Sequence, residues 1–119
     1  ELSRAGRSVA LVERKTYPFH KVCGEYVSNE IRPYVESLGV DLAALGAADI
    51  RRFQFSAPSG RILESPLDLG GFGISRYVLD ATLYDLGRAA GVHFFLNNSI
   101  EDVAFSNDTF TTSLRSGPA

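Results

Sequence analysis

The sequence predicts an α/β fold in which a parallel sheet is interrupted by antiparallel strands. Two short, nearly continuous apolar runs, at residues 8–13 and 92–96, are typical of strands buried on both faces of a parallel sheet. A helix predicted over residues 76–90 precedes the second run, and parallel strands require such a crossover. Between the two runs, Phe53 and Phe55 alternate with polar residues, a pattern that indicates antiparallel strands.

The composition is that of a globular chain and excludes several classes of function. With 119 residues, the chain is one small domain or a piece of a larger one. Its net charge of −2 offers no electrostatic reason for a nucleic-acid or anionic-membrane partner. No apolar run reaches the ~20 residues of a transmembrane helix. One cysteine and two histidines predict neither a disulfide nor a metal site, so we expect a reduced, cytoplasmic setting.

The chain opens on what we interpret as the end of a helix. Residues 1–5 read as a last helical turn, and Gly6 stands where helices end. The apolar strand at residues 8–13 follows at once. Since a helix that leads into a buried parallel strand follows an earlier strand, we expect the chain to be a fragment that begins inside a βαβ unit.

A loop and a short helix are predicted next. Residues 14–27 carry the punctuation of a loop. Ser28 and Asn29 can cap a helix that runs to about Leu38, where Gly39 ends it. The predicted apolar face of this helix consists of Ile31, Val35 and Leu38.

The middle of the chain predicts an antiparallel insertion. After a further turn at residues 41–45, strands are predicted at residues 50–57 and 61–64, joined by the turn Pro58-Ser59-Gly60. A third strand is predicted at residues 72–75.

The last third returns to the α/β pattern. The helix at residues 76–90 has Ser75 as its cap and Gly91 as its stop. Its apolar stripe consists of Leu79, Leu83, Leu86 and Ala90. Beyond the strand at residues 92–96, two further strands at about residues 99–105 and 109–114 form a hairpin.

Glu13 is the first candidate for a functional residue. In dinucleotide-binding folds, an acid at the end of the second strand accepts hydrogen bonds from a ribose diol, about 20 residues after a glycine-rich loop. That loop would lie before residue 1. The alternative is a solvated carboxylate at a strand end.

The segment Lys21-Val22-Cys23-Gly24-Glu25 is the second candidate. Gly24 would let the backbone approach a flat ligand closely. A lone cysteine is more often a small buried hydrophobe than a reactive thiol, and no base can be placed near Cys23 from the sequence. We therefore do not predict a nucleophile here, and we expect His20 to be a surface imidazole.

Ser75-Arg76 is the third candidate. An arginine at a helix start opposes the helix dipole, and a phosphate or carboxylate bound at that terminus would explain it. The alternative is an ion pair with Asp80, four residues further on. His93, within an apolar strand, is interpreted as structural.

Together these motifs resemble a known group of flavoenzymes. They are residues 9–13, Tyr17-Pro18, residues 21–25 and residues 73–76, followed by Leu79-Asp80 and Leu83. The pattern, from Ser8 to about Phe105, resembles the geranylgeranyl reductase-like group of FAD-dependent oxidoreductases. That group belongs to the class that includes p-hydroxybenzoate hydroxylase and the flavin-dependent halogenases.

The resemblance implies a domain arrangement. Residues 1–47 and 76–119 would form part of a Rossmann-like FAD-binding domain that lacks its first strand and glycine loop. Residues 48–75 would supply antiparallel strands to a substrate-side sheet.

The resemblance also implies roles for six residues. Glu13 would bind the ribose of the FAD adenosine, with Arg14 beside it. Cys23, Gly24 and Glu25 would lie near the flavin. Arg76 would contact the phosphate–ribose region of the cofactor. No catalytic residue and no metal ligand is assigned.

The function implied is that of a fragment of an FAD-dependent oxidoreductase with a small apolar substrate. It would be a reductase of isoprenoid-type double bonds or a monooxygenase, with NADPH or NADH as electron donor. The alternative is a nucleotide-binding or regulatory module without redox activity, the fragment itself being inactive. An unpaired edge of the strand at residues 9–12 would favour self-association.

Overall fold

The computed structural model describes residues 1–117 and divides the chain into two compact units. The first unit combines Glu1–Phe19 with the residues from Leu83 onward, and the second consists of His20–Thr82. Helix α2 (Arg76–Ala89) contributes its first half to the second unit and its second half to the first.

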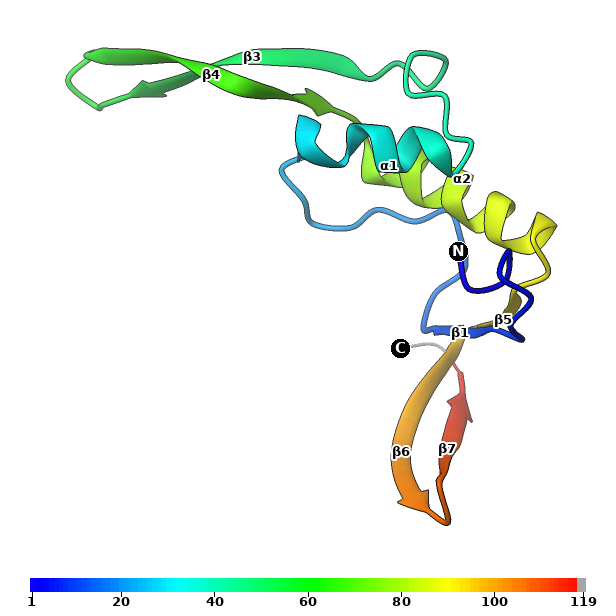
Figure 1. The fold of residues 1–119 in the computed structure, drawn as a ribbon. Helices are drawn as coiled ribbons and strands as arrows, with labels where there is room; N and C mark the ends of the chain where they lie inside the picture. The colour runs from blue at the N-terminus through cyan, green and yellow to red at the C-terminus, as the bar shows by residue number, and fades with distance from the viewer. Residues whose placement is uncertain (118–119) are drawn as a thin grey trace. The chain divides into compact units, whose positions relative to one another are not determined.

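The first unit contains the predicted parallel strand pair. Strand β1 (Ala10–Glu13) pairs with β5 (His93–Leu96) from Ala10 opposite His93 to Glu13 opposite Leu96 (Figure 1). The parallel pairing predicted from the two apolar runs is therefore confirmed. Both strands end at the same edge, which places Glu13 beside the residues that follow Leu96.

The expected burial of β1 on both faces is wrong for the residues described. Ala10 and Leu11 are exposed, because β1 and β5 form a sheet of two strands. Burial on both faces requires a covering layer on each side of the sheet. Tyr84 of α2 covers part of one face by packing edge-on against Phe94, with 4.7 Å between ring centroids.

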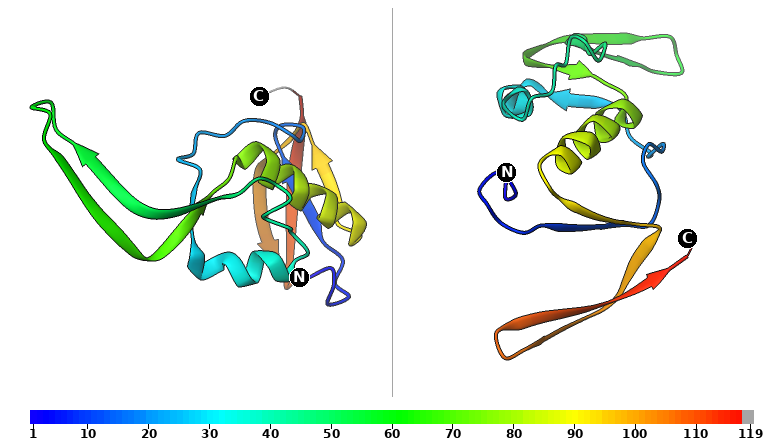
Figure 2. Two further views of the ribbon diagram at one scale, coloured as in Figure 1. Left: turned by 90° about the horizontal axis from the view of Figure 1, so that it is seen from above. Right: turned by 90° about the vertical axis from the view of Figure 1, so that its right-hand side faces the viewer.

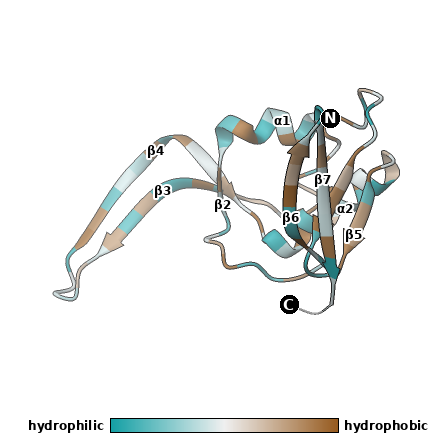
Figure 3. Cartoon of the chain, turned by 90° about the horizontal axis from the view of Figure 1, so that it is seen from below, coloured by the Kyte–Doolittle hydropathy of each residue, from teal (hydrophilic) through white to brown (hydrophobic). Residues whose placement is uncertain are grey.

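The predicted C-terminal hairpin is confirmed, with strands β6 (Asn98–Ser106) and β7 (Thr109–Ser116) antiparallel. A bulge between Ile100 and Asp102 shifts the register. Both strands carry apolar as well as polar residues, and Figure 3 colours them by hydropathy. The exposed apolar residues of the hairpin are Ile100, Val103, Phe105, Phe110 and Leu114.

The second unit contains a three-stranded antiparallel sheet in the order β2–β4–β3. Strand β2 (Tyr26–Ser28) is short, whereas β3 (Ala48–Ser56) and β4 (Ile62–Gly73) form the long hairpin that Figure 2 shows. Two predictions are corrected here. Residues 26–28 are a strand rather than loop and helix cap alone, and the strands predicted at residues 61–64 and 72–75 are the two ends of a single strand, β4, which begins at Ile62 and ends at Gly73.

Both differences have the same physical cause. Pairing with β3 runs from Ile62 to Pro66 and resumes at Gly71, and the irregularity between Ile50 and Arg52 takes up the residues between them, where Gly70 has φ of 67°. The same strand then offers its other edge to residues 26–28. These pairings join residues distant in sequence, which local patterns do not show.

The helical segment follows β2 and confirms its predicted limits. It consists of the 3-10 turn η1 (Asn29–Ile31) and α1 (Arg32–Ser37). Ser28 Oγ accepts a hydrogen bond from the backbone N–H of Glu30, and Gly39 follows with φ of 95°. The buried apolar side chains of the second unit are Val35, Val40, Leu42, Phe72, Ile74 and Leu79.

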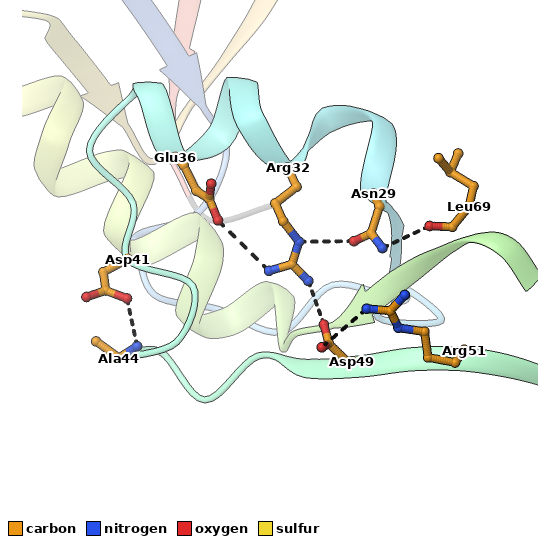
Figure 4. Close-up of polar contacts among 8 residues, drawn as sticks. All are labelled: Asn29, Arg32, Glu36, Asp41, Ala44, Asp49, Arg51 and Leu69. Carbon is orange, nitrogen blue, oxygen red and sulfur yellow. Dashed lines mark hydrogen bonds and ion pairs between the residues drawn. The ribbon is translucent and has the colours of Figure 1, made fainter.

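Arg32 joins this helical segment to the sheet (Figure 4). Its Nε donates to Asn29 Oδ1 at 3.0 Å, and its Nη2 donates to Asp49 Oδ1 on β3 at 2.8 Å. The guanidinium also lies 4.8 Å from the ring centroid of Phe72, which is fully buried. One side chain thus covers the core aromatic ring and connects two elements.

Helix α2 matches its prediction closely. Ser75 Oγ accepts a hydrogen bond from the backbone N–H of Tyr77 at 3.3 Å, and Gly91 follows the helix with φ of 82°. Leu79 and Asp80 are its buried residues.

Gly71 should not tolerate a side chain. A Cβ at this position would lie 2.6 Å from the carbonyl oxygen of Val27 and would also meet the ring of Tyr26. We expect Gly71→Ala to lower the free energy of unfolding by about 1–3 kcal/mol, because backbone in a paired strand cannot move aside. Urea denaturation of the chain measures this. Gly24→Ala is the matched control, since a Cβ there meets nothing within 4 Å; equal losses in both variants would contradict the prediction.

Candidate functional site

Glu13 and Arg14 lie at the carboxyl edge of the parallel strand pair, beside a hollow of about 350 Å³. The hollow is lined by Val12, Glu13, Arg14, Asn98, Ser99 and Ile100. The Oε1 atom of Glu13 accepts a hydrogen bond from the backbone N–H of Lys15 at 3.1 Å, which holds the carboxylate near the strand end. The carboxyl edge of parallel strands is where α/β sheets bind ligands.

Asn98 and Ser99 are residues of this hollow that the sequence analysis missed. The Nδ2 of Asn98 donates to the carbonyl oxygen of Leu96 at 2.7 Å, and its Oδ1 accepts from Ser116 Oγ at 2.9 Å. These bonds fix the amide at the end of β5. The sequence does carry a signal for them: Asn98 and Ser99 are polar and follow the second parallel strand closely. Since parallel strands end at one edge of the sheet, these residues could have been expected beside Glu13.

The segment of residues 21–25 belongs to the second unit, and Cys23, Gly24 and Glu25 are all exposed. Cys23 therefore does not follow the general tendency of lone cysteines to be buried. Its Sγ accepts a hydrogen bond from the backbone N–H of Glu25 at 3.4 Å. Glu25 has φ of 56°, and its carbonyl oxygen accepts from the backbone N–H of Ile74 at 3.0 Å.

Arg76 begins α2 and forms the ion pair with Asp80 that the sequence suggested as one alternative. Its Nε donates to Asp80 Oδ1 at 2.8 Å and its Nη2 donates to Asp80 Oδ2 at 3.0 Å. The Nζ of Lys21 approaches Oδ2 of the same carboxylate at 3.1 Å. The sequence did not predict this second cation.

The charges of this cluster stabilise one another. Burial raises the pKa of Asp80, but hydrogen bonds from Arg76 and Lys21, and their charges, outweigh it and lower that pKa below its ordinary value. The hydrogen bond to Asp80 raises the pKa of Arg76, while burial opposes the shift and the Cys23 side chain adds to it. These shifts favour the ionised carboxylate of Asp80 and the charged guanidinium of Arg76.

The predicted site residues fall into two groups. Glu13 and Arg14 lie in the first unit, and Cys23, Gly24, Glu25 and Arg76 in the second. His20 is exposed, as expected, and its ring stacks on Tyr77 with 4.7 Å between centroids. Within residues 1–117, no group of three or more His, Cys, Asp or Glu side chains could hold a metal ion. No helix in that range is long and apolar enough to cross a membrane.

Sequence comparison finds one curated relative and no matching family model. The relative is conditioned medium factor receptor 1 of Dictyostelium discoideum, which is 26% identical over 123 residues. The match covers 91% of this chain and 24% of that protein, so the chain spans about a quarter of the relative's length.

Comparison with solved structures finds proteins that share the fold over nearly the whole chain. The myxobacterial chondrochloren halogenase CndH, an FAD-dependent halogenase, matches 97% of this chain with a TM-score of 0.75 at 20% identity. A geranylgeranyl bacteriochlorophyll reductase-like protein from Thermoplasma acidophilum matches 98% with a TM-score of 0.70 at 19% identity. The chain spans 29% and 31% of these two proteins.

The chain therefore has an α/β fold that matches part of an FAD-dependent halogenase and part of a geranylgeranyl bacteriochlorophyll reductase-like protein. The predicted fold class is confirmed. Both neighbours fall within the class that the sequence motifs resembled, and identity below 25% supports likeness of fold alone.

The lowered pKa of Asp80 predicts a pH-dependent stability. Because the folded carboxylate holds its proton less tightly than the unfolded one, its stabilising effect is complete above the ordinary aspartate pKa near 4. That effect is lost as the pH falls through the lower pKa of the folded state. Urea unfolding at a series of pH values below about 5 should show a smaller fall of stability in Asp80→Asn than in the wild type. The exposed Asp85, on the same helix, provides the control variant Asp85→Asn. An identical acid dependence in wild type and Asp80→Asn would contradict the assignment.

Proposed function

We propose that this chain is part of an FAD-dependent oxidoreductase and that Glu13 binds the adenosine ribose of the cofactor. The observation that carries the proposal is the position of Glu13 and Arg14 at the carboxyl edge of β1 and β5, on a hollow shared with Asn98 and Ser99. A carboxylate suits a ribose diol, and an amide with a hydroxyl beside it adds donors and acceptors. The donor set therefore fits the group. The fold likeness to FAD-dependent enzymes supports the same conclusion.

The remaining predicted residues receive the roles that the family resemblance implies. Arg76 would bind the phosphate–ribose region, since a guanidinium recognises phosphate oxygens through several donors. Cys23, Gly24 and Glu25 would lie near the flavin, on an exposed segment where a flat ring can approach the backbone. A bound flavin would supply the redox chemistry, and these residues would bind and orient it.

The finer function follows from the same proposal. Residues 1–47 and 76–119 would belong to the FAD-binding domain, and residues 48–75 to the substrate-side sheet. The reaction would be the reduction of isoprenoid-type double bonds or the monooxygenation of a small apolar substrate, with NADPH or NADH as donor. A cytoplasmic setting and self-association through the outer edge of β1 stay predictions of the sequence.

A nucleotide-binding or regulatory module without redox activity is the second candidate. The observation that favours it is the curated relative, whose name is that of a receptor. The two candidates differ in one measurable property. An oxidoreductase shows flavin reduction by NADPH or NADH in the full-length protein, whereas a regulatory module binds the nucleotide without electron transfer.

Flavin titration of the full-length protein tests the proposal. The purified protein should carry a yellow flavin spectrum, and Glu13→Ala should weaken FAD binding roughly ten- to a hundredfold, because hydrogen bonds to a charged group contribute about 1.5–3 kcal/mol. Glu101→Ala is the matched control, since Glu101 is an exposed glutamate that pairs with Arg115 at 3.1 Å. A protein with no affinity for FAD would refute the class, and an unchanged affinity in Glu13→Ala would refute the ribose role.

Cys23 should bind near the flavin without taking part in the reaction. Cys23→Ser in the full-length protein should retain FAD and measurable turnover, because the proposal gives Cys23 a position near the flavin and no base is assigned to activate its thiol. Steady-state kinetics and the flavin spectrum check this. Complete loss of turnover with flavin still bound would make the thiol a participant.

A further inference from the structure

Asp80 differs from the other charged side chains that the structure describes. Among residues 1–117 it is the charged residue that is buried, with 10% of its side chain exposed. Its two oxygens accept from Arg76 at 2.8 and 3.0 Å, and Oδ2 also meets the Lys21 ammonium group at 3.1 Å. A buried carboxylate that is fully matched by donors holds those donors in fixed positions.

The Lys21 contact fastens the segment of residues 20–25 to the start of α2. Asp80 is one turn into the helix, directly below Arg76 in the i, i+4 relation. Lys21 reaches the same carboxylate from a segment 59 positions earlier in the chain, so the contact is tertiary. It therefore restrains a segment that has no regular secondary structure of its own.

Two other contacts fasten the same segment on either side of Lys21. The His20 ring stacks on Tyr77, and the carbonyl oxygen of Glu25 accepts from the backbone N–H of Ile74. Both partners flank Arg76 in sequence. Between the contacts made by Lys21 and Glu25, residues 22–24 are exposed, and the side chain of Val22 is fully exposed. The segment thus presents its middle to solvent while its ends are held at the helix start.

Arg76 is oriented by the same carboxylate. Asp80 occupies the Nε donor and one Nη2 donor, which leaves the Nη1 side of the guanidinium directed away from it. Without this ion pair, an arginine at a helix start would be repelled by the helix dipole and would have more rotamer freedom. Fixing it in advance lowers the entropy cost of binding an anion.

We propose that Asp80 is a positioning residue that holds Arg76 and the segment of residues 20–25 together in a binding-competent arrangement. It does so without touching the cofactor. The inference rests on the proposed function, because Arg76 and Cys23-Gly24-Glu25 are the residues assigned there to FAD. It adds that their placement depends on one buried carboxylate.

Amine labelling tests, without any cofactor, whether Asp80 holds Lys21; the contacts of Asp80 with Arg76 and Lys21 are called the clamp below. The chain has two lysines, so the ratio of Lys21 to Lys15 acetylation, measured by mass spectrometry, uses Lys15 as an internal reference. In Asp80→Asn the ratio should rise roughly tenfold, the factor of one hydrogen bond to a charged group. Asp85→Asn should leave the ratio unchanged. An unchanged ratio in folded Asp80→Asn, as judged by circular dichroism, would overturn the clamp.

If Asp80→Asn does not fold, Lys21→Met removes one side of the clamp from a residue that is only part buried. Susceptibility of residues 20–25 to limited proteolysis should then rise, while the thermal transition of the chain stays within a few degrees. Unchanged cleavage in folded Lys21→Met would overturn the clamp.

FAD affinity of the full-length protein tests the positioning role. Asp80→Asn should weaken binding roughly tenfold, Asp80→Glu should restore most of the affinity, and Asp85→Asn should bind as the wild type does. In a background that carries both Arg76→Met and Lys21→Met, Asp80→Asn should cost less than about twofold, because Asp80 acts through these two residues. Wild-type affinity in Asp80→Asn, or fully additive losses in the combined variant, would overturn the role. A wild-type protein that binds no FAD would instead refute the proposed function, and the labelling ratio would decide the clamp alone.

Discussion

The buried carboxylate of Asp80 is the interaction on which the polar architecture of the second unit depends. Removing an anion from water is costly unless nearby donors replace the lost hydration. Arg76 and Lys21 supply those donors from a helix start and from an irregular segment. Because the carboxylate of Asp80 attracts both cations, these ion pairs hold the helix start and the irregular segment together. The same contact explains an arginine at a position where the helix dipole opposes it.

The apolar packing of the second unit also supports the position of Arg76 at the start of α2. Strand β4 places Phe72 in the core and then leads through Ile74, also buried, into α2. The Arg32 guanidinium covers the Phe72 ring and bonds Asp49 on β3. The residues that lead from β4, which ends at Gly73, into α2 are therefore anchored by apolar packing, in addition to the ion pair of Arg76 with Asp80. Because the backbone before α2 is held by close packing, the contacts of Asp80 with Arg76 and Lys21 can restrain those two side chains.

The first unit shows how a small sheet can still define a site. Parallel strands begin and end together, so Glu13 and the residues after Leu96 meet at one edge even though the sheet has two strands. Asn98 closes that edge through hydrogen bonds to Leu96 and Ser116. The exposed apolar face of the β6–β7 hairpin lies in the same unit, with Phe105 and Phe110 in contact at 4.6 Å between ring centroids. The hydrogen bonds of Asn98 at the sheet edge and the exposed apolar side chains of the hairpin are thus two separate features of the first unit.

Features that depend on neighbouring residues could be predicted from the amino-acid sequence. Ser75 and Gly91 bounded α2, apolar runs predicted the parallel pair, and Glu13 stood at a strand end. Caps and periodicity act within a few residues, so they can be recognised in the sequence. Three contacts could not be predicted in this way: the pairing of residues 26–28 with β4, the ion pair of Lys21 with Asp80, and the position of Asn98 beside Glu13. Each of these contacts joins residues far apart in the chain, and its free energy exists only once the intervening segments have folded.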